Sequence, residues 1–145
     1  PRARKSFLLP GPVLLGILGF SAVYVVVITW LGLEFLEPPG IQEDLLGGGL
    51  IRFVISLILV FWGPFAEEVF FRGFMLSAFV QSVGAIRAVA ISSLVFAVAH
   101  VSPGAMAPIF FAGLLLSWLY LKTGSIWPPF IAHALQNLIA VSMVY

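Results

Sequence analysis

Residues 61–75 read FWGPFAEEVFFRGFM, and they place two adjacent glutamates and an arginine inside a long apolar stretch. Gly63 and Pro64 come just before the charges. Because proline lacks a backbone donor and disturbs a regular helix, the segment from Leu50 to Val80 is predicted to be one long helix or a helix broken near Gly63-Pro64. Charged groups inside a membrane span cost about 2.5–3.5 kcal/mol each and by default indicate a function.

The composition around this stretch is that of a membrane protein. Hydrophobic residues make up 61% of the 145 residues and charged residues only 9%, against about 25% charged in soluble domains. The net charge of +1 and the lack of a long basic run argue against nucleic-acid binding. The chain has no cysteine, which excludes disulfides, thiolate nucleophiles and cysteine-ligated zinc.

Apolar runs of about 20 residues, the length that spans a bilayer, recur along the chain, and no stretch alternates with a period of two. We therefore predict a single all-α domain over residues 1–145, a transmembrane bundle of about five helices. Its first span covers residues 11–36, and residues 49–145 form the core. After the second helix, the remaining helices are expected at Ala85–His100, Met106–Leu121 and Trp127–Tyr145.

The basic residues suggest how the bundle lies in the membrane. Arg2, Arg4 and Lys5 cluster at the N-terminus, whereas the loop over residues 37–48 is acidic. Because cytoplasmic segments are enriched in lysine and arginine, the N-terminus is predicted to be cytoplasmic. Because the helices are apolar, the lipid bilayer is an expected partner of this protein.

The two glutamates of the quoted stretch have different surroundings. Glu68 and Arg72 stand four residues apart in the acid-first order that favours an ion pair on one helix face. Glu67 points about 100° away around the helix, so Arg72 is not expected to pair with both carboxylates. Glu67 therefore needs another partner.

Both histidines of the chain lie in predicted apolar helices. His100 shares a face with Phe96 and with small residues, which indicates the side that packs against other helices. His133 and Asn137 stand at i and i+4 and share another face. Each has a structural alternative, since His100 could cap the end of its helix and His133 could simply hydrogen-bond Asn137. Their estimated depths nevertheless bring all three near Glu67.

Three motifs in this order resemble a known family. Residues 67–72 match Glu-Glu-x-x-x-Arg, residues 96–100 match Phe-x-x-x-His, and residues 133–137 match His-x-x-x-Asn. The set resembles the CAAX-processing and bacteriocin-processing intramembrane endopeptidases, also called the Abi family. The resemblance covers about Glu67 to Asn137, and members of the family usually have more spans.

The resemblance implies a glutamate-dependent peptidase, and we expect no cofactor. Glu67 and His100 would activate a water molecule, and His133 and Asn137 would bind the oxyanion, where well-placed donors lower the barrier by several kcal/mol. The implied supporting residues are Glu68 and Arg72. The implied substrate is a peptide or a membrane-anchored protein, which includes prenylated proteins, and the sequence does not identify it further.

Two other interpretations stay open. Glu67, His100 and His133 are also a ligand set for catalytic zinc with water in the fourth position, although the chain has no H-E-x-x-H motif. Alternatively, the polar cluster holds the bundle together in a membrane binding or immunity protein without catalytic activity.

Overall fold

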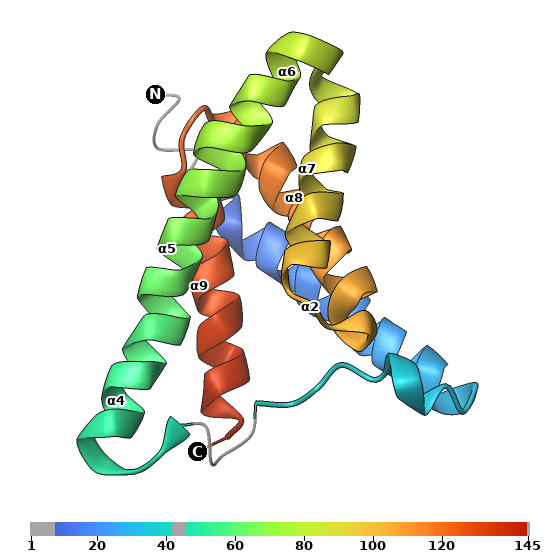
Figure 1. The fold of residues 1–145 in the computed structure, drawn as a ribbon, viewed down its shortest axis with the longest axis vertical. Coiled ribbons are helices and arrows are strands. Elements are labelled where there is room, and N and C mark those ends of the chain that lie inside the picture. Colours follow the sequence, from blue (N-terminus) through green and yellow to red (C-terminus); the bar gives the residue numbers. More distant parts are fainter. Residues whose placement is uncertain (1–7, 42–45, 145) are drawn as a thin grey trace.

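The computed structural model describes residues 8–41 and 46–144, and all regular elements in these ranges are helices (Figure 1). The predicted all-α bundle is confirmed. Three helical stretches are long and apolar enough to cross a membrane, Pro10–Trp30, Gly49–Val83 and Pro103–Thr123. The elements are α2 (Pro10–Trp30), η1 (Glu34–Leu36), α4 (Gly49–Leu57), η2 (Ile58–Trp62), α5 (Gly63–Glu68), η3 (Val69–Leu76), α6 (Ser77–Val83), α7 (Ala85–Ala99), η4 (Pro103–Ala105), α8 (Met106–Thr123) and α9 (Trp127–Ser142).

The second helix is long and is not broken at Gly63-Pro64. Elements α4 to α6 form one continuous helix of 35 residues, in which η2 and η3 are π-helical. The amide of Gly63 donates to the carbonyl of Ile58, five residues back. This wider turn lies immediately before Pro64, and it accommodates a residue without an N–H while the helix continues.

The first helix ends at Trp30, earlier than the predicted Leu36. Gly32 adopts a left-handed conformation with φ +68°, and its amide donates to the carbonyl of Thr29. The amide of Leu33 donates to the carbonyl of Ile28 at 3.0 Å. This pair of bonds is the Schellman arrangement, which closes a helix where glycine permits a positive φ, so Gly32 was the stop signal that hydropathy alone did not reveal.

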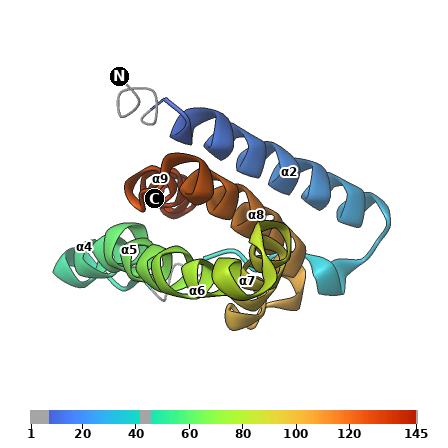
Figure 2. The same cartoon turned by 90° about the horizontal axis from the view of Figure 1, so that it is seen from above.

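The helices form three layers. Seen from above, α2 is one outer layer, α8 and α9 form the middle layer, and the long helix with α7 forms the other outer layer (Figure 2). Glycine permits the tight α7–α8 contact, since a Cβ on Gly113 would lie 2.9 Å from Cβ of Ser93. The buried core between α2, α8 and α9 consists of Val13, Ile17, Ala112, Leu116, Leu119 and Ala132.

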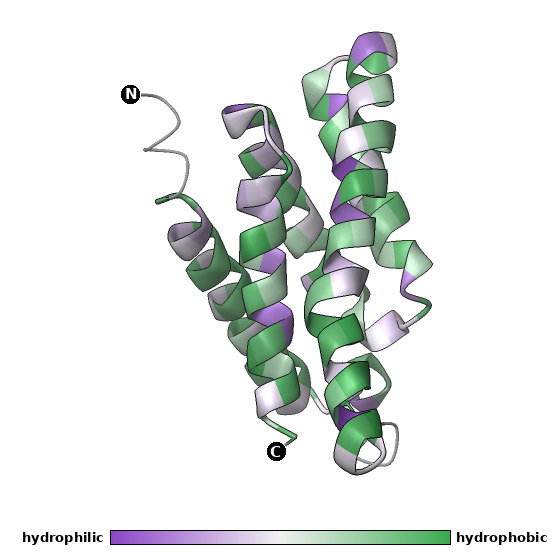
Figure 3. Ribbon diagram, turned by 90° about the vertical axis from the view of Figure 1, so that its left-hand side faces the viewer, coloured by the Kyte–Doolittle hydropathy of each residue, from purple (hydrophilic) through white to green (hydrophobic). Residues whose placement is uncertain are grey.

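Hydrophobic residues predominate along most of the length of the helices (Figure 3). Large side chains such as Leu15 (71%) and Phe53 (59%) are exposed, which suits a lipid environment because hydrocarbon imposes no penalty on them. The predicted N-terminal basic cluster and the acidic pair Glu43 and Asp44 lie outside the described residues. The cytoplasmic N-terminus therefore stays a prediction.

Candidate active site

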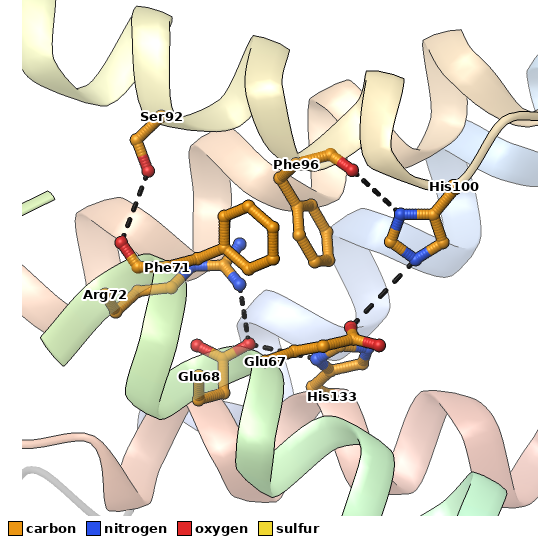
Figure 4. A network of polar contacts seen from close by, with 8 residues as sticks. All are labelled: Glu67, Glu68, Phe71, Arg72, Ser92, Phe96, His100 and His133. Atoms are coloured by element: carbon orange, nitrogen blue, oxygen red, sulfur yellow. Dashed lines mark hydrogen bonds and ion pairs between the residues drawn. The ribbon is translucent and has the colours of Figure 1, made fainter. Parts of the chain in front are cut away.

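The ionisable residues of the three motifs come from three different helices and meet in one polar cluster (Figure 4). Glu67 and Glu68 are the last residues of α5, and Arg72 lies one turn later in η3. His100 is the residue that ends α7, and His133 lies in the middle of α9. The structure thus brings together residues that are up to 66 positions apart in the sequence.

One half of the cluster is closed off from its surroundings. Oε1 of Glu68 accepts a hydrogen bond from Nη1 of Arg72 at 2.8 Å, and both side chains are 0% exposed. This confirms the predicted ion pair. The same oxygen accepts a second hydrogen bond from Nδ1 of His133 at 2.9 Å. This second contact was not predicted, because the sequence placed His133 near Glu67 and Asn137 and gave no sign of a contact with Glu68.

The other half of the cluster is partly exposed. The side chains of Glu67 and His100 are 35% and 31% exposed, and His100 Nε2 lies 4.0 Å from Glu67 Oε2. His133 Nε2 lies 3.7 Å from the same oxygen. Glu67 therefore faces both histidines across gaps longer than a hydrogen bond, as the sequence analysis expected from their depths.

Hydrogen bonds fix which nitrogen of each histidine carries a proton. His100 Nδ1 lies 2.8 Å from the carbonyl of Phe96, and His133 Nδ1 contacts the carboxylate of Glu68. Both partners are acceptors, so both Nδ1 atoms must donate, and each Nε2 carries a lone pair when its ring is neutral. His100 thus caps the end of α7, as its structural alternative described, and still presents Nε2 to Glu67.

The resulting arrangement suits a small molecule that donates hydrogen bonds. Glu67 Oε2 is a buried atom without a hydrogen-bond partner among the described residues, and it faces Nε2 of both histidines. One water oxygen about 2.8 Å from both Glu67 Oε2 and His100 Nε2 would make an angle of roughly 90° between them, close to the angle between the hydrogens of water. A water that reached this position would donate to both atoms at once.

Phe96 contacts both halves of the cluster, a role that was not predicted from the sequence. Its ring is 2% exposed and stands edge-on to the ring of His100, with centroids 4.7 Å apart. The guanidinium carbon of Arg72 lies 4.3 Å from its centroid, a favourable cation–π contact when water is excluded. The four-residue spacing to His100 was the signal that could have identified Phe96 as part of the site.

The backbone is strained directly after His100. Val101 has φ 51°, and a β-branched residue rarely adopts this left-handed conformation. Such strain costs about 1–3 kcal/mol and is found most often at functional sites. Here it turns the chain away from the axis of α7 one residue after the histidine.

Asn137 lies one turn after His133 but does not join the contacts around Glu67. Its Nδ2 donates to the backbone carbonyl of Leu59 at 2.9 Å, not to His133. Asn137 also borders a cavity of about 320 Å³ between the long helix and α9. The other residues that line this cavity are Ile41, Leu46, Ile55, Leu59, Ala140 and Val141.

The set Glu67, His100 and His133 fits zinc in its chemistry but not in its spacing. Each histidine donates Nδ1–H to an acceptor and leaves Nε2 free, as zinc-bound histidines do. Two ligands at about 2.1 Å in a tetrahedral zinc site lie about 3.4 Å apart, whereas the two separations here are 4.0 and 3.7 Å. In the part of the chain that the structure describes, no group of three His, Cys, Asp or Glu residues has a metal-binding arrangement.

The fold and the site define a class, a helical membrane protein with a glutamate and two histidines grouped between its helices. Within this class, the chain belongs to the Rce1-like family of type II CAAX prenyl endopeptidases, whose model matches residues 49–139. The matched range contains all six candidate site residues, from Glu67 to Asn137. The predicted family is confirmed.

A curated relative supports the same assignment. The chain is 29% identical over 93 residues to a Bacillus subtilis (strain 168) protein named "Putative membrane peptidase YdiL". The match covers 64% of this chain and 37% of the relative, so the aligned region spans little more than a third of that protein. No solved structure matches the chain.

Proposed function

We propose that the chain carries the catalytic centre of an intramembrane endopeptidase that hydrolyses peptide bonds of membrane-associated substrates. The observation that supports this best is the convergence of Glu67 Oε2 and His100 Nε2, 4.0 Å apart on partly exposed side chains. An acceptor pair of this kind can hold and deprotonate a water molecule. Membership of the Rce1-like family favours a peptide bond as the target.

In the proposed reaction, water donates one hydrogen bond to Glu67 and one to His100. As the water oxygen attacks the carbonyl carbon of the scissile bond, Glu67 Oε2 takes one of its protons and the carbonyl oxygen becomes an oxyanion. When the tetrahedral intermediate collapses, the C–N bond breaks and the amine leaves with the proton that Glu67 held. General base catalysis of this kind contributes about 10²–10⁴-fold to the rate.

His133 and Asn137 are the proposed oxyanion donors. Nε2 of His133 can donate only when the ring is an imidazolium, because Nδ1 already donates to Glu68. The Glu68 carboxylate accepts the Nδ1–H bond and thereby fixes the orientation of the ring. Glu68 therefore holds the His133 ring, Arg72 holds Glu68, and neither needs to touch the substrate.

The proposed substrate is a peptide or a membrane-anchored protein. Within this class, membership of the Rce1-like family suggests a prenylated CAAX-type protein. The exposed parts of Glu67 and His100 would receive the peptide backbone. A prenyl group and the bilayer would both serve to hold such a substrate at the depth of the site.

A zinc peptidase is the second candidate, and one observation favours it. Nε2 of each histidine faces Glu67 Oε2. Two imidazole nitrogens and one carboxylate oxygen are the ligands of a catalytic zinc site. If zinc were bound, it would lower the pKa of a water ligand and polarise the scissile carbonyl. The spacing between the ligand atoms favours the metal-free reaction over this one.

The deciding experiment replaces Glu67 by glutamine, which keeps the shape and removes the base. Wild-type and Glu67→Gln proteins would be reconstituted in liposomes with a fluorogenic membrane-anchored peptide, with and without a prenyl group. We expect cleavage to fall at least about 10²-fold, while the helical circular dichroism signal is unchanged. Glu34→Gln is the matched control, because Glu34 is exposed in η1, away from the cluster.

Cleavage at the wild-type rate by Glu67→Gln would remove Glu67 as the base. Loss of the helical signal in that variant would instead support the interpretation in which the cluster only stabilises the bundle. Failure of the wild-type protein to cleave either peptide would favour the non-catalytic binding protein.

A further inference from the structure

The contact between Asn137 and Leu59 has a cause in the local sequence of the long helix. In a regular α-helix, the carbonyl of Leu59 accepts from the amide of Gly63, four residues on. Here the Gly63 amide donates to Ile58 instead. The next backbone donor along would be residue 64, which is a proline and has no N–H. Leu59 is thus left without a backbone donor.

An unsatisfied carbonyl is costly at this depth. In the hydrocarbon region, each unpaired backbone group costs several kcal/mol because no water replaces the missing donor. Nδ2 of Asn137 fills the gap at 2.9 Å from the Leu59 carbonyl. Since a carbonyl can only accept, the contact also fixes the orientation of the amide: its NH₂ group, not its oxygen, is turned toward the long helix.

This contact constrains the helix that carries His133. Asn137 and His133 are four residues apart on α9, so they lie on one face of the helix, one turn apart. His133 is itself held by Glu68 at 2.9 Å. Two hydrogen bonds therefore join the same face of α9 to the long helix, one on each side of Pro64, at Leu59 and Glu68.

We propose that Pro64 is a positioning residue of the site: it frees the carbonyl of Leu59, and this carbonyl holds the amide of Asn137. One N–H of the amide is used in this contact, and among the described residues no hydrogen bond engages the second one. The second N–H remains for the oxyanion, a step that rests on the proposed function. Pro64 thus acts through Asn137 and does not need to touch the substrate.

The test is a double-mutant cycle on stability, which does not depend on peptidase activity. Pro64→Ala restores a backbone N–H near the Leu59 carbonyl, and Asn137→Leu removes the side-chain donor with little change in volume. Unfolding would be followed by circular dichroism in mixed micelles as the sodium dodecyl sulfate fraction rises. We expect Asn137→Leu to lower the unfolding midpoint in the wild-type background and to lower it at most about half as much in the Pro64→Ala background.

Gln136→Leu is the matched control, because it removes an amide from the neighbouring position of α9 that has no bond to Leu59. Its effect should be the same in both backgrounds. Equal effects of Asn137→Leu in both backgrounds would overturn the proposal, since the amide would then not serve the carbonyl that Pro64 frees.

Cleavage rates complete the test. We expect Pro64→Ala to lower kcat by about 10- to 100-fold, the size of effect that a misplaced group produces, with KM nearly unchanged. An unchanged kcat in Pro64→Ala would overturn the positioning role even if the stability cycle shows coupling. If the wild-type protein cleaves nothing, the proposed function fails, and the stability cycle still decides whether Pro64 positions Asn137.

Discussion

Replacing Glu68 by leucine would leave a positive charge buried without its counter-ion. Glu68 and Arg72 are both 0% exposed and joined at 2.8 Å, so the guanidinium cannot reach water when the carboxylate is removed. Removing one partner of a buried pair costs about 3–5 kcal/mol. The Phe96 ring, 4.3 Å from the guanidinium carbon, contacts the cation with or without Glu68, so this cation–π contact does not change the loss.

We therefore expect Glu68→Leu to lower the free energy of unfolding by about 3 kcal/mol, which is roughly a 150-fold change in the folding equilibrium. The double variant Glu68→Leu/Arg72→Met removes both charges. Apolar residues of similar size in place of a buried ion pair are often neutral or stabilising, so the double variant should recover most of the lost stability. Cleavage should remain low, because His133 Nδ1 still lacks the acceptor that Glu68 provided.

The assay is unfolding in mixed micelles at rising sodium dodecyl sulfate fraction, followed by tryptophan fluorescence, with cleavage measured on the same preparations. Glu34→Leu, at an exposed glutamate of η1, is the control for loss of a carboxylate in general. A loss below about 1 kcal/mol in Glu68→Leu would refute the reasoning, since exposed pairs contribute that little. Recovery of cleavage in the double variant would show that Glu68 does not position His133.

Two further predictions concern strain and metal. Val101→Gly should raise the free energy of unfolding by about 1 kcal/mol in the same micelle titration. The substitution relieves left-handed strain of about 1–3 kcal/mol, while glycine adds freedom to the unfolded chain. A lower stability of this variant would contradict the φ of 51° at Val101. Incubation with a strong chelator should leave the cleavage rate unchanged, and metal analysis of the active protein should find no stoichiometric zinc. Cleavage that is lost on chelation and restored by zinc would establish the zinc mechanism instead.

Contacts within one helix could be predicted from the sequence because the pitch of a helix fixes them. The four-residue spacing of Glu68 and Arg72 predicted the ion pair that the structure contains at 2.8 Å. The same spacing placed Phe96 and His100 on one face, and their rings are in contact. The all-α class followed equally directly, since hydropathy and the need to satisfy every backbone group in lipid allow few other structures.

Contacts between helices depended on rotation and depth, which a sequence does not state. The depth estimate brought Glu67, His100 and His133 to one level, but only the tertiary structure showed that Nδ1 of His133 binds Glu68, 65 residues away. The histidine protonation pattern follows from such partners and could not be read from motifs. The π turn before Pro64 could not be predicted from the sequence either, because it depends on which backbone carbonyls the neighbouring helices can hydrogen-bond.

The sequence by itself determined that this is a membrane-embedded helical protein with three polar motifs, because composition and helical spacing are local properties. Only the tertiary structure showed that the side chains around Glu68 are buried and that those of Glu67 and His100 are partly exposed. It also showed that the Asn137 amide donates to the carbonyl of Leu59 and not to His133. The physical reason is the same in each case: a buried donor or acceptor takes the partner that packing brings within about 3 Å, and packing is decided by the whole bundle.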